Sequence, residues 1–391
     1  MILPLTAINY QGGLYMKLSD IQNTNLPRIA VLFGGNSSEY QVSLSSGSAV
    51  LRAIDTGKYM PIPVGISKEG RWFLYAGDYD AITADRWQES GKCFPIYFSG
   101  DQSARGFLIS IPSSEFSSNE LSSDETASPR LVPLSVQAAI PVLHGKNGED
   151  GTVQGLFALL GIPVIGCGIL SSSLCMDKER AHQIASTLGI SVPASFCAYE
   201  GISEDDLYRA ADSLGYPLFV KPVRAGSSFG ITCIQDKSQL LAAVKEAFLY
   251  DTRIIIEEKI EGFEVGCAVM GRNFNPAGEL TIGEVDEIEL TDGFFDYTEK
   301  YTLKTSKIHV PARISPEKTK EIKDTAARLY LGLDCDYFAR VDLFLTPKGK
   351  IYFNEVNTIP GFTSHSRFPG MMKSRGIEFP DLVNRLIEME V

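Results

Sequence analysis

The chain has 391 residues, 44% of them hydrophobic, and a formal net charge of −12 at pH 7. This length exceeds what one compact core holds, so two or three domains are expected. The acidic balance argues against nucleic acid or an anionic membrane as a partner. No apolar run is long enough to span a membrane, and the N-terminus lacks a signal-peptide pattern, so the expected compartment is the cytoplasm.

Cysteine and histidine usage excludes two further classes of site. The seven cysteines are an odd number and none forms a CxxC pair, which argues against a disulfide framework or a zinc knuckle. The four histidines are scattered, so a histidine-based metal site is not expected.

The first part of the chain reads as an α/β unit. Residues 1–26 have no strand pattern and are interpreted as a flexible N-terminal extension, with Met16 as an alternative start. RIAVLFGGNSSEYQVSLSSGSAVLRAI (28–54) reads strand, loop, helix, and buried strands are expected at 60–66 and 137–145. The Ser-rich and acidic stretch 113–128 has no apolar period and is interpreted as an exposed, mobile insertion.

After GEDGTVQGLFALLGIPVIG (148–166), helix patterns alternate with short strands to about residue 258. β-rich runs then follow at 263–271, 278–290 and 303–310, with a helix near 315–331 and two paired strands before a closing helix. This order predicts a parallel α/β domain followed by two α+β lobes. The predicted domains are 27–166 (with the insertion at about 99–135), 167–258 and 259–391.

The paired strands place four polar side chains together. RVDLFL (340–345) and IYFNEVN (351–357) are joined by TPKGK, and a two- or four-residue loop gives the same register. Asp342 then lies opposite Glu355 and Arg340 opposite Asn357, all on one face. The other face is expected to carry Leu343, Leu345, Tyr352 and Asn354.

Two opposed carboxylates repel unless a cation lies between them. Hard oxygen ligands of this kind suit Mg²⁺ held between protein and nucleotide phosphates. The alternative is a solvated polar face on which the arginine neutralises an acid.

Three further segments have the residues of a nucleotide site. FVKPVRAGSSFGI (219–231) ends a strand at Lys221 and continues as a Gly/Ser-rich loop whose N–H groups suit phosphates; the alternative is an ordinary hairpin loop. IIIEEKIEGFEVG (254–266) offers a strand end for an adenine edge and a carboxylate for ribose, or simply a charged surface strand end. GFFDYTEKYTLKTS (293–306) has the residues of a lid, or of a plain β-segment.

Six motifs, in this order, resemble the D-alanine–D-alanine ligase family of ATP-grasp enzymes: FGGNSSEYQVSL, LHGKNGEDGTVQG, CMDKERAH, VKPVRAGSSFG, FARVDLF and NEVNTIPGFTSHS. The resemblance covers the chain outside 1–26 and 99–135. It implies an ATP-grasp fold with ATP between two α+β lobes, and a homodimer formed through the N-terminal domain.

The resemblance also implies roles for single residues. ATP would be bound by Lys178, Lys221, Glu258, Lys259, Glu264 and Lys300. Two Mg²⁺ ions, or Mn²⁺ in their place, would be held by Asp342, Glu355 and Asn357. Glu39 would bind the ammonium of a first D-alanine in a hydrogen-bonded trio with Ser227 and Tyr301.

Three more residues complete the implied substrate site. His144 would lie near the first substrate, Ser366 would bind the carboxylate of the second, and Arg340 would stabilise charge in the transition states. Taken singly, Glu39 reads equally as a helix N-terminal acid, His144 as a core-edge histidine and Ser366 as a helix N-cap.

The implied reaction joins two D-amino acids, through a D-alanyl phosphate, for peptidoglycan precursor synthesis. The lid sequence FFDYTEKY, with VDEIEL before it, resembles the VanG-type D-Ala–D-Ser ligases of glycopeptide resistance. D-serine is therefore expected as the second substrate. The alternatives are a housekeeping D-alanine–D-alanine ligase, another ATP-grasp carboxylate–amine ligase, and a nucleotide-binding protein without catalysis.

Overall fold

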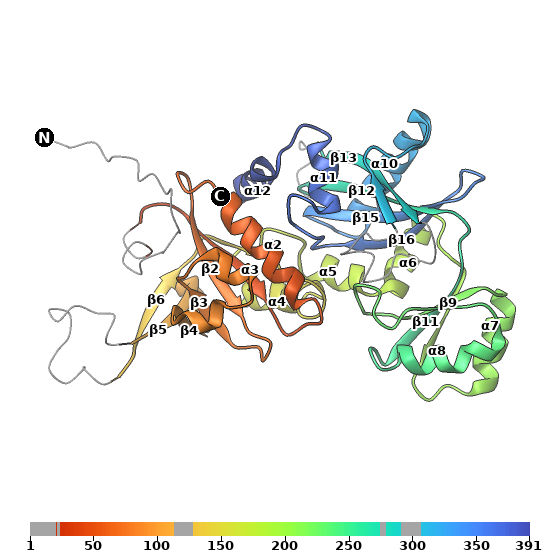
Figure 1. Cartoon of the computed structure of the whole chain (residues 1–391), viewed down its shortest axis with the longest axis horizontal. Helices are drawn as coiled ribbons and strands as arrows, with labels where there is room; N and C mark the ends of the chain where they lie inside the picture. The colour runs from red at the N-terminus through yellow and green to blue at the C-terminus, as the bar shows by residue number, and fades with distance from the viewer. Residues whose placement is uncertain (1–20, 22–23, 113–127, 274–278, 291–305) are drawn as a thin grey trace, which may run out of the picture.

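The computed structural model describes residues 21, 24–112, 128–273, 279–290 and 306–391. Three β-sheets follow one another along the chain, and the first lies apart from the other two at one end of the elongated molecule (Figure 1). The C-terminal helix α12 (Phe379–Glu388) returns to the first sheet, where Asn384 Oδ1 accepts from the Asp55 N–H at 2.9 Å.

The first sheet has the strand order β6-β5-β4-β3-β2-β1-β7. The prediction of a parallel sheet holds for β1, β2 and β7 but is wrong for the other strands, which pair antiparallel because short connections return the chain beside itself. The bounds are β1 Arg28–Gly34, β2 Met60–Ile66, β3 Trp72–Tyr75, β4 Cys93–Phe98, β5 Gly106–Ile111, β6 Arg130–Ser135 and β7 Ala138–Pro141.

Two of these strands lie in the predicted insertion 99–135. Phe107 and Ile109 of β5 and Leu134 of β6 are buried in the core beside Phe157, so apolar alternation extends the sheet here. Most of the Ser-rich stretch, residues 113–127, lies outside the described residues.

Helices cover both faces of the first sheet. Phe33 and Trp87 pack on one face with α2, and Ile62 and Val64 pack on the other with α4. The helices and 3₁₀ turns of this region are α2 Tyr40–Ala53, α3 Tyr79–Thr83, η1 Trp87–Ser90, η2 Gln102–Ala104 and α4 Thr152–Leu159. Helices α5 (Ile169–Met176) and α6 (Lys178–Thr187) then lead to the second sheet.

The second sheet is antiparallel, with the order β10-β9-β11-β8. Its strands are β8 Ser195–Tyr199, β9 Leu218–Pro222, β10 Thr232–Ile234 and β11 Arg253–Glu258, and one face is covered by α7 Glu204–Leu214, η4 Lys237–Gln239 and α8 Leu240–Ala247. Ser203 caps α7 by accepting from the Asp206 N–H at 3.1 Å.

The third sheet has the order β14-β13-β12-β15-β16. Its strands are β12 Phe263–Gly271, β13 Thr281–Leu290, β14 Ser306–His309, β15 Tyr337–Leu345 and β16 Ile351–Asn357, and its helices are α10 Pro316–Gly332 and α11 Arg367–Lys373. Ser315 caps α10 ahead of Pro316, a pairing that favours a helix start.

The β15–β16 hairpin has the predicted pairs at the site but not at the turn. Asp342 lies opposite Glu355 and Arg340 opposite Asn357, as predicted. The loop is one residue longer than the longer predicted form, and the register shifts between Asp342 and Leu343, so that Leu343 faces Phe353. Asn354 is therefore an unpaired bulge residue, and placing Tyr352 and Asn354 with Leu343 and Leu345 was wrong.

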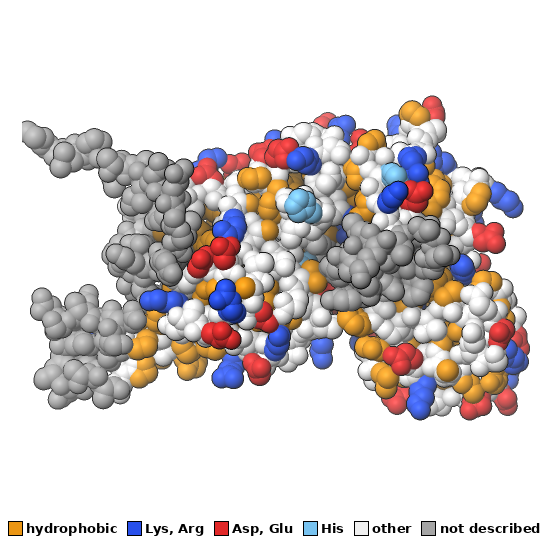
Figure 2. Space-filling view, in the orientation of Figure 1, with side chains coloured by type: hydrophobic (Ala, Val, Ile, Leu, Met, Phe, Trp, Pro, Cys, Tyr) orange, Lys and Arg blue, Asp and Glu red, His pale blue; other side chains and the backbone are white. Residues whose placement is uncertain are grey.

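Acidic and basic side chains are mixed over the face shown in Figure 2 and do not form one basic patch, in keeping with the net charge of −12. Within the described part of the chain, no helix is both long enough and apolar enough to cross a membrane.

Candidate active site

A cavity of about 540 Å³ lies between the second and third sheets. Its lining includes seven of the predicted site residues: Lys178, Lys221, Ser227, Glu258, Lys259, Glu264 and Glu355. Three segments that are far apart in the sequence, the glycine/serine loop, the end of β11 and the β15–β16 hairpin, thus meet at one cavity.

Two buried lysines form the cationic wall of this cavity. Lys221 Nζ lies 2.5 Å from Glu257 Oε2, and Lys178 Nζ donates to the Ala225 carbonyl at 2.8 Å. Burial alone raises the pKa of Glu257, but the Lys221 ammonium and other nearby cations more than offset this, so the pKa is lowered and the carboxylate is charged. Glu257 is the counter-ion that the sequence reasoning did not identify.

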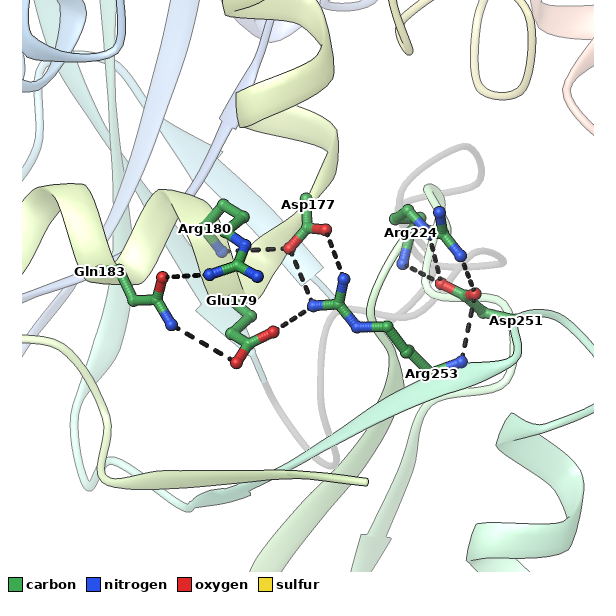
Figure 3. A network of polar contacts seen from close by, with 7 residues as sticks. All are labelled: Asp177, Glu179, Arg180, Gln183, Arg224, Asp251 and Arg253. Atoms are coloured by element: carbon green, nitrogen blue, oxygen red, sulfur yellow. Dashed lines mark hydrogen bonds and ion pairs between the residues drawn. The ribbon is translucent and has the colours of Figure 1, made fainter. Parts of the chain in front are cut away.

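An ion-pair network holds the start of α6, which carries Lys178. Figure 3 shows Arg253 of β11 reaching between Asp177 and Glu179, with an Nη1–Oδ2 distance of 3.1 Å to Asp177. Two residues earlier, Asp251 accepts from the backbone N–H and the guanidinium of Arg224, at 2.8 and 2.7 Å. The start of β11 and the residues just before it therefore anchor both the helix that carries Lys178 and the N-terminal end of the glycine/serine loop.

Glu39, which lies between β1 and α2 in the N-terminal part of the chain, contacts Ser227 of this loop. The Ser227 hydroxyl donates to Glu39 Oε1, and Glu39 is buried at the start of α2 without making a side-chain cap bond. Gly145 has φ +74°, and a Cβ there would lie 2.1 Å from Glu39 Oε2, so only glycine leaves room for this carboxylate. Two members of the predicted trio are thus in contact, while Tyr301 and also Lys300 lie outside the described residues.

His144 is buried beside this junction. Its Nδ1 lies 2.9 Å from the Ile359 carbonyl, so Nδ1 carries the proton, and Nε2 lies 3.1 Å from the Ser46 hydroxyl. Burial lowers the pKa of His144 to about 4, which keeps the ring neutral at pH 7.

Glu149 is a second acid near Glu39 that the sequence reasoning did not identify. Its carboxylate accepts from the N–H groups of Gly145 at 2.8 Å and Ile359 at 3.2 Å. Burial, and next the charge of Glu39, raise the pKa of Glu149 to about 8. The GED sequence directly after the His144 loop was the available signal.

The predicted polar face of the hairpin is buried at Arg340 and Asp342 and partly buried at Glu355 and Asn357. Arg340 donates to both carboxylate oxygens of Asp342, at 2.8 and 2.7 Å, and Asn357 Nδ2 donates to the same carboxylate at 2.9 Å. Arg340 therefore does neutralise an acid, as the alternative reading supposed, but with Asp342 only 1% exposed the face is not solvated.

These residues fit a magnesium ion only in part. Within the described residues, no group of three or more His, Cys, Asp or Glu side chains is disposed to hold a metal. Asp342 and Glu355 are opposed, and Asn357 keeps a carbonyl oxygen free to accept because its amide nitrogen is the donor. Two carboxylates and one amide oxygen match the small protein share of Mg²⁺ ligands when phosphates supply others.

Arg367 is a further residue of the site that the sequence reasoning left without a role. Its guanidinium donates to Asp286 at 2.8 and 2.9 Å and to Glu264 at 2.8 Å, and lies 3.4 Å from Asp342. It directly follows the closing motif, which ends at Ser366, and this neighbourhood was the available signal, but its partners are distant in sequence.

The remaining predicted residues are placed as follows. The N–H groups of Glu258 and Lys259 already donate to the carbonyls of Ala194 and Pro217, at 2.9 and 3.2 Å. Ser366 is the residue before α11, and its hydroxyl lies 2.9 Å from Thr363 Oγ1 and makes no cap bond. His144, Arg340, Asp342, Asn357 and Ser366 do not line the cavity.

Comparison with known proteins gives the family. Residues 28–167 match the model "D-ala D-ala ligase N-terminus" and residues 185–388 match "D-ala D-ala ligase C-terminus". A vancomycin C-type resistance protein, VanC1 of Enterococcus gallinarum, is 40% identical over 93% of this chain and 98% of its own length. A D-alanine–D-alanine ligase of Caldicellulosiruptor bescii is also 40% identical, over 93% of this chain and 95% of its own length.

Solved structures agree in fold. The VanG D-Ala:D-Ser ligase of Enterococcus faecalis has a TM-score of 0.81 and 51% identity, covering 94% of this chain and 100% of that one. A D-alanine–D-alanine ligase of Bacillus anthracis complexed with ATP has a TM-score of 0.66 and 26% identity, covering 93% and 97%. The architecture is the ATP-grasp fold, and the chain belongs to the D-alanine–D-alanine ligase family.

Proposed function

We propose that this protein is an ATP-dependent ligase that joins D-alanine to a second D-amino acid for peptidoglycan precursor synthesis. The observation that carries the proposal is the contact between Glu39 and Ser227. It sets a buried carboxylate, suited to a substrate ammonium, beside a cavity walled by Lys178 and Lys221. An amino acid held by Glu39 would then present its own carboxylate toward bound nucleotide.

In the first proposed step, a carboxylate oxygen of D-alanine attacks the γ-phosphorus of ATP, and ADP leaves. Lys178 and Lys221 would hold the phosphates, and the glycine/serine loop would cover them with N–H groups. Mg²⁺, when bound by Asp342, Glu355 and Asn357, would neutralise phosphate charge.

In the second step, the amine of the second amino acid attacks the acyl carbon, phosphate leaves, and the amine loses a proton. Arg340 is the nearby cation that would stabilise the oxyanion, and removing one such donor commonly costs about 3–4 kcal/mol of barrier. The Ser366 hydroxyl would bind the second carboxylate. Lys300 and Tyr301 keep their proposed roles at the γ-phosphate and at the first ammonium.

D-serine is the proposed second substrate. The 51% identity to the VanG D-Ala:D-Ser ligase supports it. The second candidate is a D-alanine–D-alanine ligase, which the 40% identity to the Caldicellulosiruptor bescii enzyme supports. A site that bonds the serine hydroxyl discriminates strongly, because D-alanine then leaves buried polar groups unpaired.

The test is a phosphate-release assay with ATP, Mg²⁺ and D-alanine, with and without D-serine, in which the dipeptide is identified by mass. We expect phosphate release with D-alanine, and mainly D-Ala–D-Ser when both amino acids are present at matched concentrations. Equal yields of the two dipeptides would contradict the D-serine preference. No phosphate release under either condition would contradict the ligase proposal itself.

A further inference from the structure

His182 lies in α6, one helical turn after Lys178, and does not line the cavity. Its side chain is buried at 5% exposure, between β11 of the second sheet and β16 of the third. We propose that His182 is a positioning residue that couples the phosphate-binding lysine of one sheet to the metal-binding carboxylate of the other. The inference rests on the proposed function and adds a residue that acts from behind the site.

The first contact of His182 is with the third sheet. Nε2 lies 3.0 Å from the backbone carbonyl of Asn354, and because a carbonyl only accepts, Nε2 is the donor. Asn354 is the bulge residue of the hairpin and directly precedes Glu355. A bulge carbonyl has no partner in the strand ladder, so this hydrogen bond sets the orientation of the peptide that carries Glu355.

The second contact is with the second sheet. Nδ1 lies 3.6 Å from Glu257 Oε1, while the other oxygen of Glu257 holds Lys221. Nδ1 and Oε1 are both buried and have no hydrogen-bond partner within the described residues. Since Nε2 carries the proton of the neutral ring, Nδ1 presents a lone pair to Oε1, and these two acceptors hold each other at a distance. A shift of the imidazole would therefore move Glu257, and Glu257 would move Lys221.

The helix adds a third connection. Residues four apart lie on the same helix face, so Lys178 and His182 project from one side of α6. The His182 ring also packs edge-on against Phe353, with centroids 5.5 Å apart. One face of α6 thus contacts both the β15–β16 hairpin and the cationic wall. Such a face can fix the relative positions of the second and third sheets around the phosphates of bound ATP.

Two substitutions separate these contacts. His182→Gln places an amide nitrogen near the Nε2 position and keeps the bond to Asn354. His182→Asn loses that bond and places an amide oxygen near the Nδ1 position, which keeps an acceptor facing Glu257. Loss of a supporting partner of this kind costs about 10- to 100-fold in metal affinity or activity. We expect His182→Gln to raise the KM for ATP about 10-fold with kcat nearly unchanged. We expect His182→Asn to lower kcat about 10-fold and raise the Mg²⁺ concentration needed for half-maximal rate.

Two controls separate positioning from a merely structural role. His182→Phe keeps the packing on Phe353 but loses both polar contacts, and should show both defects. Thr187→Ala alters an exposed hydroxyl of the same helix and should match the wild type. A structural role would lower the thermal midpoint of all three His182 variants and move kcat and KM together.

Calorimetric binding of ATP, with and without Mg²⁺, supplies a readout that does not need turnover. The proposal predicts that His182→Gln weakens ATP binding in both conditions and that His182→Asn weakens only the Mg²⁺-dependent part. Variants that bind like the wild type, or that lose both equally, would overturn it. If the wild type binds ATP but forms no dipeptide, the ligase proposal fails while this test still decides the role of His182.

Discussion

The second-sheet wall of the cavity carries lysines and the third-sheet wall carries acids, yet both regions pair their buried charges with residues of opposite sign. On the second-sheet wall, Lys221 is paired with buried Glu257. Behind the third-sheet wall, Asp342 does not line the cavity itself but lies opposite Glu355, which does, and is paired with buried Arg340. An unpaired charge at such depth is costly, and Lys221 and Asp342 each have a counter-ion in place before any ligand arrives. Binding of a nucleotide and cation would then exchange partners on both walls, and would not bring new uncompensated charge into the interior.

This comparison predicts that, on the third-sheet wall, no other carboxylate can take over the metal-binding role proposed for Glu355. Glu355→Ala should lower turnover by more than about 10³-fold, equivalent to about 4 kcal/mol of barrier, because Asp342 is already engaged by Arg340. Steady-state phosphate release measures the loss, and circular dichroism checks that the protein is folded. Lys348→Ala, in the exposed hairpin loop, is the control. Retained turnover in Glu355→Ala would remove this residue from the metal site.

The cationic wall should fail in a different way. Lys221→Met leaves Glu257 buried and uncompensated, so we expect the free energy of unfolding to fall by about 3–5 kcal/mol, together with loss of activity. Adding Glu257→Gln should restore stability but not activity, which denaturant unfolding and phosphate release measure separately. An unchanged free energy of unfolding in Lys221→Met would show that Lys221 is not needed to compensate the charge of Glu257.

His144 makes the stability of the protein depend on pH, because its buried ring is neutral at pH 7, unlike the paired charges of the two cavity walls. Its pKa is about 4 in the folded protein against an ordinary 6.5, so the unfolded chain takes up a proton first as the pH falls. Stability is therefore complete above pH 6.5 and decreases toward pH 4, by about 3 kcal/mol from this residue. The measurement is denaturant unfolding at pH 7.5 and pH 4. His144→Asn should lose correspondingly less, and equal losses in both proteins would contradict the assignment.

The smallest expected effect comes from the support behind the cationic wall. Arg253→Gln leaves Asp177 and Glu179 unpaired beside Lys178, and should raise the KM for ATP about 10-fold, or about 1.4 kcal/mol. Arg253→Lys should recover part of this affinity, because it keeps the charge but loses the two-pronged geometry. Arg209→Gln removes an exposed pair with Asp206 and should have no measurable effect. A wild-type KM in Arg253→Gln would show that the network is not needed.

Local pattern predicted much of the fold and the site. Strand alternation placed Asp342 opposite Glu355, and the order of motifs placed the lysines and the loop at one cavity. Arg367 could not be paired in advance, because Asp286 and Glu264 lie 81 and 103 residues away and only the folded sheet brings them together. The same holds for His182 and Glu257, whose meeting depends on how α6 crosses between two sheets.

The errors have local physical causes. The apolar alternation in 106–111 and 130–135 is short and adjoins a Ser-rich stretch. The composition of the region therefore led to the prediction of an insertion where the structure has two core strands. In the hairpin, the loop was predicted one residue too short, but the bulge at Asn354 takes up that residue before the site is reached. The correct pairing of Asp342 with Glu355 therefore came from two features that compensate each other.

This compensation has a use in protein engineering. Removing one residue from the loop 346–350 would leave Asp342 opposite Glu355, because the pair Leu345–Ile351 closes the loop and the bulge at Asn354 sets the register beyond it. The hairpin can thus be shortened at its tip, or its tip can be opened for an inserted sequence, without changing the pairing of Asp342 with Glu355. The hairpin runs from its exposed tip to Asp342 and Glu355, so a change in the length of the loop is a way to alter the surroundings of the proposed metal site from the protein surface.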